Sequence, residues 1–272
     1  MGDPEHKNLI KSMSERVPSI LHLGTPDAPR AIVLVTAHWI GRKPLISNGK
    51  KHKLYYDYGG FPPEMYKLKY DAPGSPDVAK EVYDLLEGAG FSPEMDEQRG
   101  SADFFNVLDI TNAMAGWDHG VFVPMLLINP KADIPIVQVS VMSSSSPAQH
   151  YAMGQALSSL RDSGVAIIGS GMPTFHNLRI LFSGGANDKG FKARNAQWSE
   201  TLTNAIKTEK SEERGKKLDS WREWTGAKEA HPVGGEEHFL PLIVCAGAGG
   251  EGNAEAFADD VGGVKQYSYY WT

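Results

Sequence analysis

The sequence predicts an α/β fold with a central, mainly parallel or mixed sheet that is flanked by helices in a single domain. Three observations support this: uninterrupted apolar runs rich in β-branched residues, amphipathic segments between them, and turn residues where the two kinds of segment meet. Strands that alternate with helices are typical of parallel sheets. The 272 residues suffice for one large domain. We therefore expect residues 1–272 to form one domain.

Three apolar runs predict the strands. Residues 31–36, 134–141 and 165–169 contain many Val and Ile side chains and no charged ones, as strands buried on both faces do. Pro135 should fall at the start of its strand, where a missing N–H group is tolerated. In such sheets, ligands bind at the carboxyl ends of the strands.

Capping residues and apolar periodicity predict the helices between these strands. Ser75-Pro76 should begin a helix that ends at Gly88. Ser146-Pro147 should begin a second helix that ends near Gly164. A third helix is expected over about residues 189–207, where apolar side chains form one stripe.

Two segments nearer the C-terminus are less regular. Residues 240–246 are apolar enough for a strand, but acidic residues precede them and glycines follow, which favours a helix. Residues 211–230 are so rich in charged side chains that we expect an exposed helix or connection.

Composition excludes several classes of protein. The net charge of −6, with scattered basic residues, argues against a nucleic-acid partner. No apolar run is long enough to span a membrane, and the charged N-terminal residues do not resemble a signal peptide. Cys245 is the only cysteine, which excludes an internal disulfide and indicates a cytoplasmic protein. Because Cys245 lies in an apolar stretch, we expect a buried structural thiol.

Four histidines stand in short motifs that adjoin predicted elements. Imidazole is the commonest metal ligand and the usual acid or base near neutral pH. His38 stands just past the end of the first strand, and His176 follows a Gly-Ser-Gly segment after the strand over 165–169. His119 lies beside Gly120 in an expected turn, and His238 follows two carboxylates at an expected helix start. Ordinary structural roles are favoured for His6, His52, His150 and His231.

Several longer motifs follow one another from about residue 30 to the C-terminus. They are Thr36-Ala-His-Trp39 with the strand before it, Tyr56-Asp-Tyr-Gly-Gly-Phe-Pro62, Tyr70-Asp-Ala-Pro-Gly-Ser-Pro76, Trp117-Asp-His-Gly120, Ala132-Asp-Ile-Pro-Ile-Val-Gln-Val-Ser140, Gly169-Ser-Gly171, His176-Asn-Leu-Arg179 and Glu237-His-Phe-Leu-Pro-Leu242. In these motifs and in their order, the chain resembles the class III extradiol ring-cleavage dioxygenases, in the group similar to 4,5-DOPA extradiol dioxygenase.

This resemblance implies an extradiol dioxygenase-like catalytic domain with one mononuclear metal. In the family, histidines from three motifs hold the metal, and two of these motifs carry over to His38 and His238. His176 corresponds to a histidine proposed as acid or base next to the metal. His119 corresponds to a histidine that lines the substrate pocket, so His176 and His119 are the expected catalytic residues.

The sequence departs from the family pattern in two places. The N-terminal His-Gly-x-Pro motif, which ends a first strand in the family, is missing, so we expect that strand and its metal ligand to be lacking. His22 is only superficially similar, because it lies too near the next strand and no glycine follows it directly. Residues 101–115 separate Arg99 from the Trp117 motif as an insertion that should affect the position of His119.

The function that the resemblance implies is the extradiol opening of a catechol such as DOPA with O₂. Fe(II) is the expected cofactor, and zinc fits the same imidazoles. The expected partners are a small catechol and O₂, without nucleic acid or membrane. One alternative is a catalytically impaired relative that binds a metal or a small aromatic ligand without turnover, which the missing ligand favours. A zinc hydrolase that uses the same histidines is chemically feasible, but the motif set argues against it.

Overall fold

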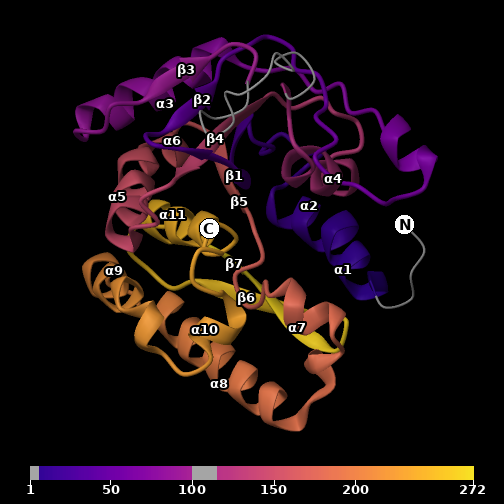
Figure 1. The fold of residues 1–272 in the computed structure, drawn as a ribbon. Helices are drawn as coiled ribbons and strands as arrows, with labels where there is room; N and C mark the ends of the chain where they lie inside the picture. The colour runs from indigo at the N-terminus through magenta and orange to yellow at the C-terminus, as the bar shows by residue number, and fades with distance from the viewer. Residues whose placement is uncertain (1–5, 100–114) are drawn as a thin grey trace. The chain divides into compact units, whose positions relative to one another are not determined.

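In the computed structural model, which describes residues 6–99 and 115–272, the chain divides into two units (Figure 1). We call residues 13–144 and 159–170 the sheet unit. Residues 1–12, 145–158 and 171–272 form the helical unit. Most of the predicted insertion, residues 101–115, lies outside the described residues. The prediction that residues 1–272 form one catalytic domain stays a prediction.

The sheet unit is built on a mixed sheet of five strands, counted over the described residues, in the order β3-β2-β4-β1-β5. β1 pairs in parallel with both β4 and β5, β2 pairs in parallel with β3, and β2 pairs antiparallel with β4. This confirms the predicted α/β class with a mainly parallel sheet. The strands are β1 (Ala31–Gly41), β2 (Leu45–Ser47), β3 (Glu94–Asp96), β4 (Ile136–Met142) and β5 (Val165–Ser170).

The three predicted strands are confirmed, but β1 is longer than its apolar run. Thr36 pairs with Ser140 and Ile40 pairs with Val141, so residues 37–39 form a bulge opposite two consecutive residues of β4. A bulge turns side chains in a new direction within a strand. His38 therefore lies inside β1, and the prediction that it stands past the end of the strand is wrong.

Helices cover the sheet, and one face holds a continuous core. α2 (Val17–Ile20) and α4 (His119–Ile128) pack on this face, with Ile32, Leu34 and Ile136 from the strands. α3 (Pro76–Gly88) contacts β2, β3 and β4, and α6 (Ser159–Asp162) contacts β5. The 3₁₀ turn η3 (Pro63–Lys67) lies in the segment before α3. Residues 6–30 are helical or turn-like, without a strand.

The helical unit has its own core, centred on Trp198, Trp221 and Phe239. A two-stranded antiparallel hairpin of β6 (Glu255–Val261) and β7 (Val264–Tyr270) completes it. Its helices and short turns are α1 (Lys7–Lys11), α5 (Pro147–Leu157), α7 (Leu178–Phe182), η5 (Gly185–Asn187), α8 (Lys189–Ile206), α9 (Ser211–Asp219), η6 (Trp221–Glu223), α10 (Ala227–Ala230) and α11 (Leu240–Ala248), and η2 (Ser12–Arg16) begins in this unit and ends in the other.

α5 and α11 approach so closely that side chains would separate them. A Cβ atom on Gly154 of α5 would lie 1.9 Å from the carbonyl oxygen of Val244, and one on Gly247 of α11 would lie 2.1 Å from that of Tyr151. Glycine is needed at both positions because the two backbones are in direct contact. This contact fixes α11, which begins two residues after His238.

Most helix predictions are confirmed, with two differences. α3, α8 and α11 form where they were predicted, and Ser75 caps α3 as expected. The segment that begins at Ser146-Pro147 is divided, because α5 ends at Leu157 and α6 follows. Residues 211–230 are helical but not simply exposed, since Arg214 and Trp221 are buried. The many charges of this segment concealed the apolar side of α9 and η6. No helix in residues 6–99 or 115–272 is long and apolar enough to cross a membrane.

Candidate active site

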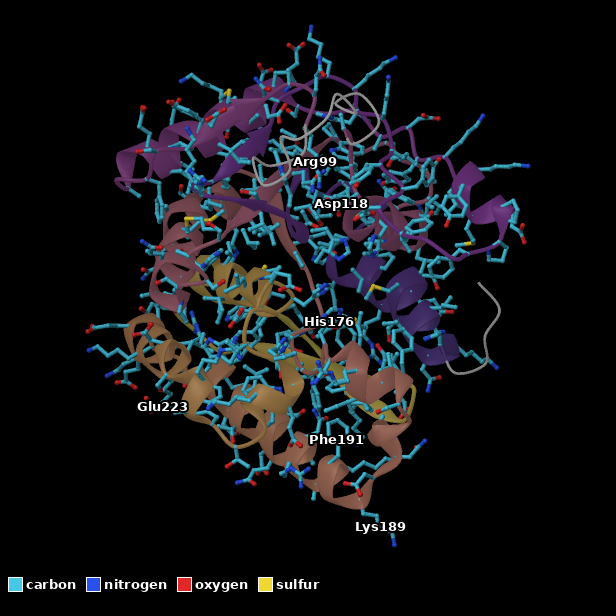
Figure 2. All side chains as sticks on the ribbon, viewed as in Figure 1. Arg99, Asp118, His176, Lys189, Phe191 and Glu223 are labelled. Atoms are coloured by element: carbon cyan, nitrogen blue, oxygen red, sulfur yellow. The ribbon has the colours of Figure 1, made fainter. Side chains whose placement is uncertain are left out.

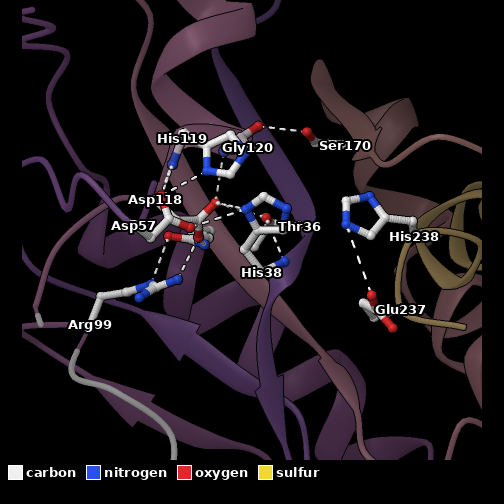
Figure 3. Close-up of polar contacts among 11 residues, drawn as sticks. Thr36, His38, Asp57, Arg99, Asp118, His119, Gly120, Ser170, Glu237 and His238 are labelled. Carbon is white, nitrogen blue, oxygen red and sulfur yellow. Dashed lines mark hydrogen bonds and ion pairs between the residues drawn. The ribbon is translucent and has the colours of Figure 1, made fainter. Parts of the chain in front are cut away.

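Each unit contains one cluster of two histidines and a carboxylate. In each cluster, three atoms able to bind a metal, one from each side chain, lie within 4.8 Å of one another. We call the cluster in the sheet unit the sheet group and the one in the helical unit the helical group. Figure 3 shows the sheet group in close-up, together with Glu237 and His238 of the helical group. The sheet group is His38, Asp57 and His119, and the helical group is His176, Glu237 and His238.

The sheet group is held together by Asp57, which lies in the segment between β2 and η3. His38 comes from the bulge of β1, and its Nδ1 lies 3.1 Å from Asp57 Oδ2. His119 is the first residue of α4, and its Nδ1 lies 2.7 Å from Asp57 Oδ1. The backbone N–H of His119 donates to the same oxygen at 2.9 Å. One carboxylate thus contacts both rings.

Asp118 supports this arrangement from inside the protein. It is fully buried and caps α4, with its Oδ1 accepting hydrogen bonds from Thr36 Oγ1 at 3.0 Å and from the backbone N–H of Gly120 at 2.9 Å. Its other oxygen is bound by Arg99 and by the side-chain amide of Gln138. Arg99 and Asp118 are labelled in Figure 2. Because both partners are buried, this ion pair fixes the start of α4, and with it His119.

The charge distribution shifts two pKa values in the sheet group. Burial raises the pKa of Asp57, but hydrogen bonds from His119 and His38 outweigh burial, so its pKa lies well below the usual range. Burial lowers the pKa of His38. Its hydrogen bond to Asp57 and the charge of Asp118 raise the pKa by more than burial lowers it, so the net result is a raised pKa. Asp57 is therefore an anion that favours N–H groups directed at it.

A cluster of aromatic side chains in the sheet unit reaches His119 through Tyr58. The ring of Tyr58 meets that of His119 edge-on, with centroids 5.6 Å apart. Tyr58 also contacts Tyr66, Phe61 and Phe122. The Tyr58 hydroxyl donates to the carbonyl oxygen of Met65 at 2.6 Å, which fixes the ring. Phe61 is 55% exposed, so part of this aromatic surface faces solvent.

The helical group is arranged differently. The rings of His176 and His238 are stacked, with centroids 3.4 Å apart and an interplanar angle of 19°. The backbone N–H of His176 donates to Ala230 O, and that of Met172 donates to His238 O, so backbone contacts hold both histidines. Glu237 Oε1 lies 4.0 Å from His238 Nε2, which is too long for a hydrogen bond.

Both groups fit a divalent transition metal in their type of donor. Two imidazoles and one carboxylate are the donor set of non-heme Fe(II) centres, and zinc also accepts these ligands. In the sheet group, however, both Nδ1 atoms already lie at Asp57. A metal or substrate that leaves these two contacts in place would therefore bind His38 or His119 through Nε2.

The structure pairs the predicted histidines in an unexpected way. Each group contains one histidine predicted as a metal ligand, His38 or His238, and one predicted as catalytic, His119 or His176. His119 is not in a turn, as predicted, but begins α4, because Asp118 acts as the N-cap. Gly120, which suggested the turn, lies within the helix.

Sequence reasoning missed the carboxylates of the two groups. Asp57 lies inside the Tyr56–Pro62 motif, and Glu237 directly precedes His238, so both were visible without an assigned role. Asp118 also stood in a motif, next to His119. The position of Asp118 and Glu237 directly before a motif histidine was a signal that these carboxylates belong near the site. Asp57 had no such signal, because its motif contains no histidine.

Three further histidines, His52, His150 and His231, have structural surroundings. His231 is fully buried, and its Nε2 donates to Pro173 O at 2.8 Å. Burial lowers the pKa of His231 to about 3. His150 is buried in α5, where burial lowers its pKa, and the ring of His52 stacks on Trp117. Cys245 on α11 is only partly buried, less than predicted.

Comparison with known proteins decides the family. A family model described as the catalytic LigB subunit of aromatic ring-opening dioxygenase matches residues 2–269. The chain belongs to the LigB family of aromatic ring-opening dioxygenases. This confirms the predicted family and the prediction of an enzyme of the extradiol ring-opening type, which uses a non-heme metal.

Named relatives of this LigB-family chain include fungal, plant and bacterial proteins. It is 45% identical to the dioxygenase tasH of Hapsidospora irregularis, over 100% of this chain and 81% of that protein. It is 37% identical to the 4,5-DOPA dioxygenase extradiol of Beta vulgaris, over 97% and 88% of the two chains. The crystal structure of an uncharacterized protein, JW3007 of Escherichia coli K12, superposes with a TM-score of 0.69 at 25% identity, over 97% and 92% of the chains.

Proposed function

We propose that this LigB-family protein opens the aromatic ring of a catechol such as DOPA, next to the two hydroxyl groups, with O₂. The observation that carries the proposal is the match of the family model over residues 2–269. Relatives named 4,5-DOPA dioxygenase extradiol support DOPA as the first catechol to test. Histidines at the positions that the family motifs prescribe support the chemistry.

The proposed metal ligands are His38 and His238, and Fe(II) is the proposed metal. Fe(II) supplies open coordination positions and the redox chemistry that reaction with O₂ requires. The bulge of β1 aims His38 from a rigid strand, and the close packing of α11 on α5 fixes the segment that carries His238. Rigid supports of this kind favour metal binding, because the donor atoms stay in place.

The proposed catalytic residues move protons. His176 accepts the proton that a catechol hydroxyl loses on binding, and His176 or His119 returns a proton as the ring opens. Both side chains are imidazoles, which exchange protons near neutral pH. The aromatic surface at Tyr58 and Phe61 offers a stacking partner for the catechol ring on the His119 side.

An oxygen-triggered assay tests the proposal. The protein is loaded with Fe(II) without oxygen, mixed with DOPA or another catechol, and then exposed to O₂. We expect a yellow ring-opened product, followed by absorbance and by mass. Stoichiometric bound iron without any product from a panel of catechols would favour the impaired relative that binds a metal or aromatic ligand without turnover.

Variants test the proposed roles. His176→Ala should reduce the turnover number by about 10²–10⁴-fold, the usual contribution of a general acid or base. His38→Ala and His238→Ala should each lose bound iron, measured by elemental analysis. His22→Asn is the matched control: His22 is exposed with φ of 53°, which Asn tolerates, and it should keep both iron and activity. Full turnover by His176→Ala would contradict its role.

A further inference from the structure

The contacts of Asp57 restrict where the protons of two imidazoles lie. An ionised carboxylate only accepts hydrogen bonds. Each ring directs Nδ1 at Asp57, at 3.1 Å from His38 and 2.7 Å from His119. Each Nδ1 must therefore carry a hydrogen for these contacts to be favourable. In a neutral imidazole the other nitrogen, Nε2, then has the lone pair.

Asp57 is itself held in this role. Its Oδ1 also accepts the backbone N–H of His119, at the N-terminus of the ten-residue helix α4. A negative charge is stabilised there by the unpaired N–H groups and the helix dipole. The side chain of Asp57 is only 13% exposed, so water competes little for these contacts. The carboxylate thus has a fixed position between the two rings.

We propose that Asp57 is a positioning residue that holds both His38 and His119 in the Nδ1–H tautomer and thereby presents Nε2 of His38 to the metal and Nε2 of His119 to the substrate. This inference rests on the proposed function for the partners of the two Nε2 atoms. Hydrogen bonds from a ligating histidine to a carboxylate commonly fix its tautomer and orientation. The unusual feature here is that one carboxylate serves two histidines with different roles.

The structure also distinguishes this role from direct metal binding by Asp57. Both of its oxygens already accept hydrogen bonds, one of them from two donors. A metal on Asp57 together with the Nδ1 atoms would have to displace the hydrogens from those contacts. A metal on Nε2 of His38 leaves all three contacts intact.

Nuclear magnetic resonance of the whole protein with ¹⁵N-labelled histidine tests the tautomers without any turnover. Spectra are recorded at about pH 9, where ordinary imidazoles are neutral. Long-range ¹H–¹⁵N correlations distinguish Nδ1–H from Nε2–H, and His38→Gln and His119→Gln assign the signals. We expect Nδ1–H on both rings, and retention of both after Zn²⁺ is added. An Nε2–H tautomer on either ring of the metal-free protein, or loss of the Nδ1–H signals with Zn²⁺, would overturn the proposal.

Asp57→Asn provides the second measurement. The new asparagine has an NH₂ donor in place of one carboxylate oxygen, so its side chain cannot accept a hydrogen bond from each ring as Asp57 does. At least one of the His38 and His119 rings should therefore change to the Nε2–H tautomer. Affinity for Zn²⁺, measured by competition with a coloured chelator, should fall by about 10–100-fold. Asp71→Asn, at an exposed aspartate, is the matched control and should change neither property.

The outcomes separate this proposal from the proposed function. Protein with both Nδ1–H signals but no ring-opened product from any catechol would leave the role of Asp57 intact and contradict the function. Ring-opened product from a protein whose His38 or His119 is in the Nε2–H form would support the function and contradict the role of Asp57. If Asp57→Asn does not fold, the wild-type spectra with and without Zn²⁺ still decide the question.

Discussion

The two histidine–carboxylate groups have the same kinds of side chain but use the carboxylate differently. In the sheet group, Asp57 accepts hydrogen bonds from both rings, and the buried Arg99–Asp118 pair supports the helix start beside it. In the helical group, the two rings stack on each other, and Glu237 is 4.0 Å from the nearer one. The difference shows that a shared donor set does not imply a shared role. Asp57 orients both imidazoles of its group through hydrogen bonds, whereas Glu237 is too far from His238 Nε2 to do the same.

Removal of Asp118 from the sheet unit and of Glu237 from the helical unit should give the largest difference in lost stability. Asp118→Ala leaves Arg99 buried without its partner and removes the cap of α4, so we expect a loss of about 3–5 kcal/mol in unfolding free energy. Glu237→Ala, in the other group, should cost less than about 1 kcal/mol, because its ion contact is long and partly exposed. Urea unfolding of both variants measures the two values. Equal losses would contradict the comparison.

A fall in pH should change the stabilising contributions of His231 in the helical unit and His38 in the sheet unit in opposite directions. His231 in the helical unit has a pKa lowered to about 3 by burial, so the unfolded chain binds a proton that the folded one does not. Stability therefore falls as pH drops from about 6.5 towards 3, by about 1.4 kcal/mol for each pH unit well below 6.5. His38 has a raised pKa, so its contribution is present below about 6.5 and is lost as pH rises through the higher folded value.

His231→Gln isolates the first of these effects. Gln keeps a donor for Pro173 O but does not titrate, so unfolding free energy should depend less steeply on pH between about 6 and 4 than in the wild type. Between about pH 6.5 and pH 4.5, the wild type should lose about 2–3 kcal/mol more unfolding free energy than His231→Gln. Asp57 also loses stabilising contacts in acid, but it does so equally in both proteins. Parallel curves would show that His231 is not the responsible group.

The close backbone contact of α5 with α11, near His238, should tolerate an added methyl group less well than α3 of the sheet unit. Gly154→Ala places a Cβ atom 1.9 Å from a carbonyl oxygen of α11, so we expect a loss of about 1–3 kcal/mol and a shift of the His238 resonances. Gly88→Ala on α3 is the control, because nothing lies within 4 Å of its added Cβ atom. Helix propensity predicts a gain of up to about 1 kcal/mol for this control. Unchanged His238 signals in Gly154→Ala would show that α11 does not set its position.

The sequence predicted the fold where local signals agree with tertiary structure. The strand cores of β1, β4 and β5 and the capped helix α3 follow from apolar runs and from Ser75-Pro76. The three-residue strands β2 and β3 are too short to produce a periodic signal. The bulge at residues 37–39 depends on its pairing with β4, which no local pattern encodes.

The candidate site was predictable in its histidines but not in their grouping. Motifs identified His38, His119, His176 and His238, whereas their pairing depends on the fold of each unit. Asp57 lies 62 residues from His119 in the sequence, so their hydrogen bond has no local signal. Arg99 and Asp118 could not be paired from the sequence either, because salt bridges between distant charged residues leave no periodicity.

Two helix caps, one beside the helical group and one on α3 of the sheet unit, should give the smallest difference in stability. Asn177, directly after His176, caps α7 through Ile180 N–H at 3.3 Å, and its amide donates to Glu229 O at 2.9 Å. Asn177→Ala should cost about 1 kcal/mol, a typical value for a lost cap. Ser75→Ala, which removes the cap of α3, should cost a similar amount. Only Asn177→Ala should also shift the His176 resonances, since its cap adjoins that residue. A shift of the His176 signals in both variants would mean that general loosening, and not the cap, positions His176.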